Sequence, residues 1–347
     1  MYFLRNLNIH KVLMNNKNIG GEKVKGKFRA AVLALLGGLI LSFSVIGCSL
    51  FEDPIDYDQP IRIGLLPIID SVPFYAAEAD GLFEEQGLNV QLETFSSAAE
   101  RNVALQTGAI DAQLADLIAT GLLNNDEHLV QIVKTTYRAN DQNGMIALIA
   151  GKDSNVKTPS DLVGKEVGIS SNSLIEYHLD MYLDDAGINR DDVVKVEVAS
   201  IPTRMELLSS GQLETAILPE PLTTLAVKFG GTIVIDDQDS RLGLSVLEFK
   251  KDFIENHPGL VELIVAIHDE SIGNINSDPS NYEHLLSEKA RLPEVLQETF
   301  RMPPFPVGDI PTEAEITKSN DWLLSKGLID SARSYEEVVN TRFTQGN

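Results

Sequence analysis

The stretch IRIGLLPIIDSVPFYAAEADGLFEEQGLNVQLETF, residues 61–95, decides the fold. It opens with an apolar run (IRIGLLPI), continues in a helical pattern (PFYAAEADGLF) and ends in a second strand pattern (LNVQLETF). Gly81 stands where a helix end favours a residue that tolerates a left-handed backbone. A strand, a helix and a strand of these lengths predict a βαβ unit with parallel strands.

The alternation of strands and helices continues downstream in two series. The first series runs to about Tyr137, and the second restarts at GMIALIAGKD (residues 144–153) and is complete by about Asp237. Beyond LSVLEFKKDFIENHPGL the chain is mainly helical, with Pro258 near a first helical turn. We therefore predict two α/β lobes, formed by residues 61–140 plus 241–347 and by residues 141–240. The chain would cross between them near Tyr137–Gly144 and Asp236–Leu244.

The N-terminal part has the layout of an export signal. Lysines and an arginine between residues 23 and 29 precede an apolar run from Ala30, which ends in VIGC at Cys48, the only cysteine. This motif resembles a bacterial lipobox, so we expect residues 1–47 to be removed and Cys48 to be lipidated. An uncleaved membrane helix and a free buried thiol are the alternatives. Residues 48–60 have the composition of a spacer.

Composition excludes nucleic acid as a partner. The formal net charge is −23, and residues 1–47 hold seven basic residues and a single acidic one, so the remainder is more acidic still. Such a surface repels nucleic acid and anionic lipids. We expect a monomer that is held at the cell membrane by its lipid and faces the periplasm or the exterior.

Several segments together resemble a known family. PFYAAEADGLFEEQGLNVQL, ERNVALQTGAIDAQLAD, DLVGKEVGIS and MELLSSGQLETAILPEP occur in the order and spacing seen in substrate-binding proteins of the nitrate, sulfonate, taurine and thiamine-precursor class. The likeness covers most of residues 61–270. It implies a type II periplasmic-binding-protein fold with two lobes around a cleft and two hinge crossings. It also implies capture of a small solute for an ABC permease and its ATPase subunits, with no cofactor and no catalysis.

Candidate ligand-binding residues follow the strand ends, because ligands of open α/β sheets bind beyond the carboxyl ends of strands. A helix start at 171–173 could bind an anion or act as an ordinary cap. Glu220, between two prolines, could face the cleft or the start of the next helix. Phe74 and Tyr177 could stack on a ligand or belong to the core. The candidate set is Asp70, Ser71, Phe74, Ser96, Ser97, Asp116, Tyr137, Arg138, Ser171, Asn172, Ser173, Tyr177 and Glu220.

The charge of the solute depends on which of these residues face it. Arg138, Arg101 and Arg204 could pair with a sulfonate or nitrate, although Arg204 has the setting of a solvated helix residue. Asp70, Asp116, Glu176 and Glu220 favour instead a neutral or cationic heterocycle such as a pyrimidine amine or a flavin-like ring. We lean towards the uncharged or cationic aromatic solute.

Common catalytic motifs are absent from the sequence. It contains no P-loop, HExxH, CxxC or GxSxG pattern, and its histidines lack metal-ligand spacing. Two alternatives to import remain: a ligand-sensing lipoprotein for a signalling partner, and an enzyme of the same fold that makes a thiamine pyrimidine.

Overall fold

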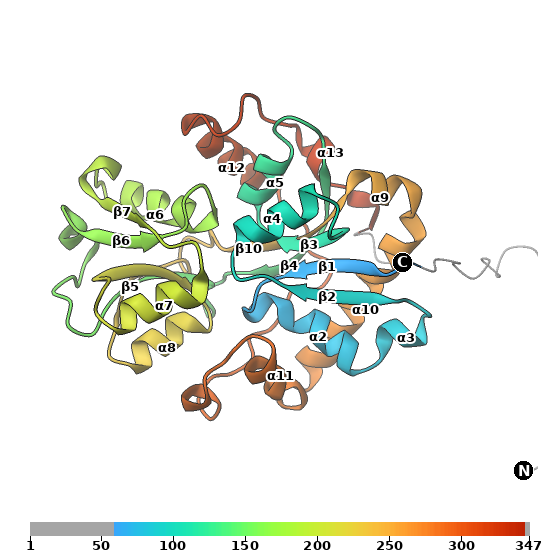
Figure 1. Cartoon of the computed structure of the whole chain (residues 1–347), viewed down its shortest axis with the longest axis horizontal. Coiled ribbons are helices and arrows are strands. Elements are labelled where there is room, and N and C mark those ends of the chain that lie inside the picture. The colour runs from blue at the N-terminus through green and yellow to red at the C-terminus, as the bar shows by residue number, and fades with distance from the viewer. Residues whose placement is uncertain (1–58, 344–347) are drawn as a thin grey trace, which may run out of the picture. The chain divides into compact units, whose positions relative to one another are not determined.

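The structure is a computed structural model that describes residues 59–343. The predicted signal (residues 1–47) and Cys48 lie outside the described residues. The described chain forms two mixed sheets covered by helices (Figure 1), which confirms the expected fold class. We call the elements around the two sheets the first lobe and the second lobe.

The first sheet has five strands in the order β2-β1-β3-β10-β4. Its strands are β1 (Ile61–Leu65), β2 (Val90–Thr94), β3 (Ala112–Ala115), β4 (Val130–Arg138) and β10 (Leu244–Lys250). β1 pairs in parallel with β2 and β3, as the βαβ pattern predicts. β10 runs antiparallel to both β3 and β4, because it returns from the second lobe, so the sheet is mixed rather than parallel throughout.

The second sheet repeats this plan in the order β7-β6-β8-β5-β9. Its strands are β5 (Ile146–Ala150), β6 (Glu166–Ile169), β7 (Val194–Glu197), β8 (Thr215–Pro219) and β9 (Thr232–Asp236). β6 pairs in parallel with β7 and β8, and β5 is antiparallel to β8 and β9. The central strands β5 and β8 are buried along their whole length, which explains why they appear in the sequence as continuous apolar runs.

Helices cover both sheets (Figure 1). Those of the first lobe are α2 (Val72–Ala79), α3 (Leu82–Glu85), α4 (Ala98–Gln106), α5 (Leu117–Leu123), α9 (Lys251–Asn256), α10 (Pro258–Ser277), α11 (Glu283–Glu288), α12 (Glu313–Ser325) and α13 (Tyr335–Val338). Those of the second lobe are α6 (Leu174–Asp185), α7 (Ile201–Ser209) and α8 (Leu222–Lys228). Gly81, at φ +74°, separates α2 from α3 in the left-handed conformation that its lack of a Cβ permits.

Two segments join the lobes, residues 139–145 between β4 and β5 and residues 237–243 between β9 and β10. We call them the crossing segments. Asp237 ties them together, since its Oδ1 accepts hydrogen bonds from the backbone N–H groups of Met145 (2.8 Å) and Ile146 (3.2 Å). The strand ends beside these segments are therefore held close to each other.

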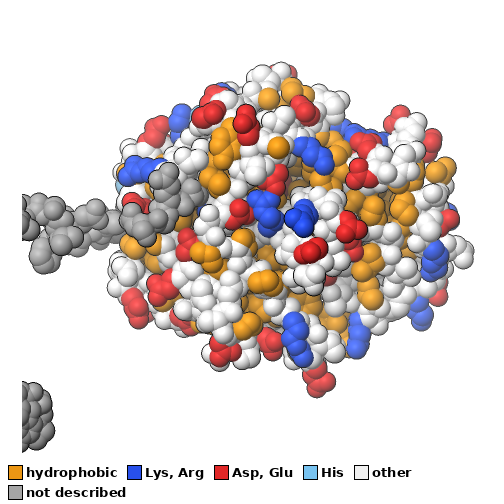
Figure 2. All heavy atoms as spheres, turned by 180° about the vertical axis from the view of Figure 1, so that it is seen from behind, with side chains coloured by type: hydrophobic (Ala, Val, Ile, Leu, Met, Phe, Trp, Pro, Cys, Tyr) orange, Lys and Arg blue, Asp and Glu red, His pale blue; other side chains and the backbone are white. Residues whose placement is uncertain are grey.

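The surface of the described part is mixed in character. On the face in Figure 2, acidic and basic side chains are interspersed with hydrophobic ones, and no broad basic area gathers there. Within residues 59–343, no helix is both long and apolar enough to cross a bilayer.

Candidate functional site

A cavity of about 50 Å³ lies between the two lobes, at the carboxyl ends of β1, β3, β6 and β8. We call it the cleft cavity. The lobes meet around it: the backbone N–H of Ile201 in α7 donates to the carbonyl of Ser96 after β2 at 3.3 Å. Ile201 also packs against Leu66 and Ile68 of the first lobe. These contacts across the cavity describe a closed arrangement of the lobes.

The first-lobe wall of the cleft cavity carries buried carboxylates beside an arginine. Asp70, Arg101 and Asp116 line it and are nearly inaccessible to solvent. Burial raises the pKa of Asp70, and the hydroxyl of Ser245, which donates to Asp70 Oδ2 at 2.6 Å, offsets this only in part. Burial also raises the pKa of Asp116, whereas the charge of Arg101 lowers it. The first-lobe wall thus presents two carboxyl groups as hydrogen-bond acceptors and one positive charge, that of Arg101.

The second-lobe wall carries Arg204, which is fully buried rather than solvated as its sequence setting suggests. Its Nε donates to the carbonyl of Ile217 and its Nη1 to that of Val198, both at 2.7 Å. Nη2 is buried without a hydrogen-bond partner. Desolvation lowers the pKa of Arg204 to about 10, so the guanidinium stays charged at neutral pH. A buried cation with a free N–H group can pair with an oxyanion.

The helix start at 171–173 acts mainly as a cap. Carboxylates already occupy two of its backbone donors, since Glu197 accepts from the N–H of Ser171 and Glu176 from that of Asn172, each at 2.7 Å. Ser173 caps α6 by accepting from the N–H of Ile175, and it also lines the cleft cavity. The Arg204 side chain, not this helix start, therefore offers the open donor.

The remaining predicted residues of the first lobe stand near the cleft without lining its cavity. Ser71 donates to the carbonyl of Leu66 at 2.7 Å. Ser97 caps α4, and Ser96 provides the cross-lobe carbonyl. Phe74 is fully buried, with its ring 4.6 Å from that of His268, so it belongs to the core of the first lobe.

Three other predicted residues lie away from the cleft cavity. Arg138 forms ion pairs with Asp309 (2.8 Å) and with Glu315. The Tyr177 ring lies against Trp322 of α12, at 5.5 Å between ring centroids. Tyr137 is buried and faces a different cavity.

Tyr137 and Glu220 line the same second cavity. This cavity has a volume of about 280 Å³ and lies beside the crossing segments. We call it the crossing cavity. Glu220 accepts hydrogen bonds from the N–H (3.2 Å) and the hydroxyl (3.0 Å) of Thr224, so it caps the start of α8 while it lines the cavity. Glu220 thus stands at the start of α8 and lines the crossing cavity, and it is not among the residues that line the cleft cavity.

Sequence reasoning missed most of the apolar lining. Leu66, Ile68, Ile175 and Ile201 contribute to the cleft cavity, and no aromatic side chain lines it. Their position within a few residues after strand ends was the available signal. It was weak because apolar residues at those positions usually serve the core.

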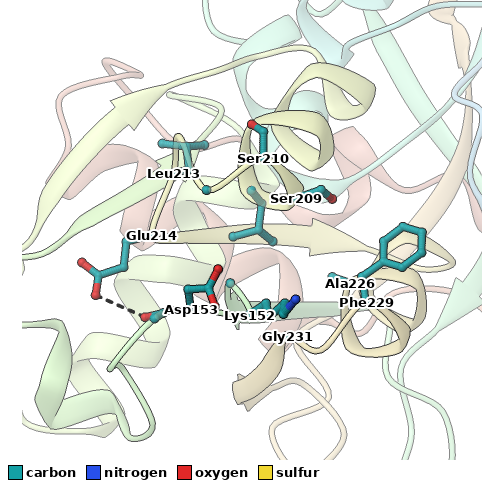
Figure 3. A pocket seen from close by; sticks show the side chains of 13 residues that line it. Lys152, Asp153, Ser209, Ser210, Leu213, Glu214, Ala226, Phe229 and Gly231 are labelled. Carbon is teal, nitrogen blue, oxygen red and sulfur yellow. Dashed lines mark hydrogen bonds between the residues drawn. The ribbon is translucent and has the colours of Figure 1, made fainter.

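A third cavity, of about 290 Å³, lies at the opposite end of the second sheet, where β5 ends and β8 begins (Figure 3). Glu214 lies at its edge and accepts from the hydroxyl of Ser154 at 3.2 Å. Lys165 forms an ion pair with Glu214 at 3.1 Å. Between residues 59 and 343, no three His, Cys, Asp or Glu side chains are grouped in a way that could hold a metal ion.

Solved structures with the same fold include both binding proteins and an enzyme. The alkanesulfonate-binding protein SsuA from Xanthomonas axonopodis pv. citri, bound to MOPS, is 16% identical with a TM-score of 0.69, over 84% of this chain and 100% of its own. The aliphatic sulphonate binding protein SsuA from Escherichia coli is 18% identical with a TM-score of 0.64, over 80% and 95%. The desulfurization enzyme DSZB is 14% identical with a TM-score of 0.61, over 82% and 97%.

At these identities the likeness establishes the periplasmic-binding-protein fold. No curated protein matches the sequence significantly. The model of the NMT1-like family matches residues 57–285, which is more than half of the chain. With its two sheets, its two crossing segments and the enclosed cleft cavity, this chain belongs to the NMT1-like family.

Proposed function

We propose that the protein captures a small solute in the cleft cavity and delivers it to the permease of an ABC importer. The free Nη2 of Arg204, buried at the cavity, carries the proposal. At Arg204 the cost of desolvation outweighs the attraction of the nearby Glu197 charge, and a bound anion would add to the compensation. The matched sulfonate-binding proteins support a solute of this kind.

The solute that fits best is a sulfonate or a similar small oxyanion, rather than the planar heterocycle favoured by the sequence. No aromatic ring lines the cleft cavity for stacking, whereas Arg204, whose buried Nη2 has no hydrogen-bond partner, is among the residues that line it. Asp70 and Asp116, on the first-lobe wall, would accept from a hydroxyl or ammonium group at the other end of the solute. A small aminosulfonate such as taurine combines both features.

The mechanism follows from the closed arrangement. The solute enters when the lobes separate about the crossing segments, and its contacts with both walls favour closure. The permease then recognises the closed form. In this role the protein releases its solute chemically unchanged, whereas an enzyme with the same fold would convert it.

Calorimetric titration of the purified protein tests the proposal, with taurine, ethanesulfonate, nitrate, a pyrimidine amine and riboflavin as candidate solutes. We expect a sulfonate to bind and to be recovered unchanged. Replacing Arg204 by Met should weaken binding about 10- to 100-fold, the range for loss of a hydrogen bond to a charged group. Arg190→Gln, which alters a partly exposed arginine of the second lobe outside the cavity, is the matched control. Equal binding by Arg204→Met, or binding of the heterocycles alone, would refute the oxyanion assignment.

We also propose that Cys48 carries a lipid that anchors the protein to the membrane. Its place at the end of an apolar run supports this. Two or more acyl chains hold a protein firmly at a bilayer. The variant Cys48→Ser should appear in the soluble fraction after cell lysis; tight retention of that variant would favour an uncleaved helix instead.

A further inference from the structure

The crossing cavity lies back to back with the cleft cavity. At three places, neighbouring residues of the chain line different cavities. The crossing cavity is lined by Ile69, Gly144 and Glu220, and the cleft cavity by their neighbours Asp70, Met145 and Pro219. The two cavities share no lining residue. The two cavities therefore have separate linings, although at these three places only a peptide bond separates a residue of one lining from a residue of the other.

The crossing cavity has walls from both lobes. Ile69, Tyr137 and the loop 299–303 belong to the first lobe, whereas Glu220 and Thr224 belong to the second. Residues 142–144 and Gln238 add the crossing segments themselves. A molecule held here would touch both lobes and the two segments about which they move, so its binding is linked to their relative placement.

Charge in the crossing cavity points to a cationic occupant. The only hydrogen bonds to the Glu220 carboxylate come from Thr224, and no lysine, arginine or histidine of the described residues pairs with it. Burial, with the nearby negative charge of Asp237, raises the pKa of Glu220 to about 7. A carboxylate that is poorly solvated and lacks a counter-charge gains most from an added cation.

The other lining residues suit an organic cation with an apolar body. Ile69, Phe300 and Pro303 are apolar, and the Phe300 ring offers a face to a cation or to another ring. Arg301 also lines the cavity, but its Nη1 donates to the carbonyls of Glu298 (2.9 Å) and Phe300 (3.0 Å). Its guanidinium is thus engaged by its own loop.

We propose that the crossing cavity is a second binding site, which takes a small primary amine with its ammonium group on Glu220 and its apolar part against Phe300 and Pro303. The site goes beyond the proposed capture of an oxyanion in the cleft and does not depend on it. Its volume of about 280 Å³ is near the lower end of the range for small-molecule pockets.

The test compares 2-phenylethylamine with its neutral analogue 2-phenylethanol by calorimetric titration of the full-length protein at pH 8. We expect the amine to bind at least about 10-fold more tightly, as a charge-assisted hydrogen bond provides. Glu220→Gln should remove this preference. Glu214→Gln is the matched control, because it neutralises a carboxylate at the other end of β8, in the cavity of Figure 3, and should keep the preference.

A second measurement serves if Glu220→Gln fails to fold. In the wild-type protein the preference for the amine should fade as the pH falls from 8 to 5.5, because Glu220 becomes protonated while a primary amine stays charged. A preference that survives this change, or that survives Glu220→Gln, overturns the proposal. Loss of amine binding in Asp116→Asn, which keeps the acceptor that caps α5, would overturn it too, by placing the amine on the cleft carboxylates. Sulfonate binding retained by Glu220→Gln would separate this site from the proposed function.

Discussion

The Nε2 atom of His178 lies 3.4 Å from Oδ2 of Asp237, and both side chains are fully buried. His178 Nδ1 lies 2.8 Å from the carbonyl of Leu174, which can only accept, so Nδ1 carries a hydrogen. Neither Nε2 of His178 nor Oδ2 of Asp237 has a hydrogen-bond partner within the described residues. Their close approach places α6 directly beside the crossing segments that Asp237 holds together.

We expect Asp237→Asn to be far less disruptive than Asp237→Ala. An asparagine can still accept from the N–H groups of Met145 and Ile146, and its amide nitrogen would lie near Nε2 of His178. Alanine leaves buried donors unsatisfied and should lower the free energy of unfolding by about 3 to 5 kcal/mol, as for a broken buried pair. Urea denaturation measures both variants. Equal losses would mean that the hydrogen bonds of Asp237 contribute little.

Gly243 lies against Asp237 so closely that a larger residue does not fit. A Cβ at this position would stand 2.2 Å from Asp237 Oδ2 and 2.7 Å from the Cβ of Met145. Gly243→Ala should therefore destabilise the protein by about 1 to 3 kcal/mol, the usual cost of overpacking. Gly273→Ala is the control, since no heavy atom lies within 4 Å of its Cβ position in α10. It should raise the melting temperature, because alanine favours a helix over glycine; the opposite order of the two variants would contradict this account.

Trp322 is the only tryptophan in the sequence, and it connects α12 to the second lobe. Its Nε1 donates to Oδ2 of buried Asp180 at 2.9 Å, while its ring packs on Tyr177. Trp322→Phe removes the donor and keeps an aromatic ring, so we expect a loss of about 1 to 2 kcal/mol in unfolding free energy. Trp322→Ala also removes the packing and should cost about 3 to 5 kcal/mol. Chemical denaturation separates these cases. Equal losses would leave no share for the ring packing, and no loss in Trp322→Phe would leave none for the hydrogen bond.

Glu248 should make the stability of the protein fall as the pH rises. Burial raises the pKa of Glu248 to about 7, outweighing the hydrogen bonds from Thr120 and Gln113 that lower it. The folded state therefore holds the proton more tightly than the unfolded chain. Its stabilising contribution is complete below the unfolded pKa, near 4.3, and is lost as the pH rises through about 7.

Glu248→Gln removes this titration. Between pH 5 and pH 8 the wild-type protein should lose about 1 to 3 kcal/mol relative to the variant, as judged by denaturation at each pH. Glu255→Gln, an exposed change in α9, should instead follow the wild type. Parallel pH profiles for wild type and Glu248→Gln would show that Glu248 is not protonated on folding.

Much of the fold could be predicted because its signals are local. The βαβ pattern of residues 61–95 reappears as β1, α2, α3 and β2, and Gly81 takes the left-handed conformation expected of it. Residues such as Ser97 and Ser173 cap the helices that begin after them. Asp70 and Asp116 could be placed beside the cleft because Asp70 lies in the loop after the first strand and Asp116 directly follows the third. Such features depend on neighbours within a few residues, which the sequence displays directly.

The sequence by itself determined the order of strands and helices, the family, and the strand ends at which a site would form. Only the tertiary structure decided which charges are free there. Arg138 forms ion pairs with Asp309 and Glu315. Carboxylates accept the backbone N–H groups of Ser171 and Asn172. By contrast, Nη2 of Arg204 is buried in the cleft wall without a hydrogen-bond partner. The reason is physical: a side chain's burial and partners depend on residues brought near by folding, and these can be far away along the chain.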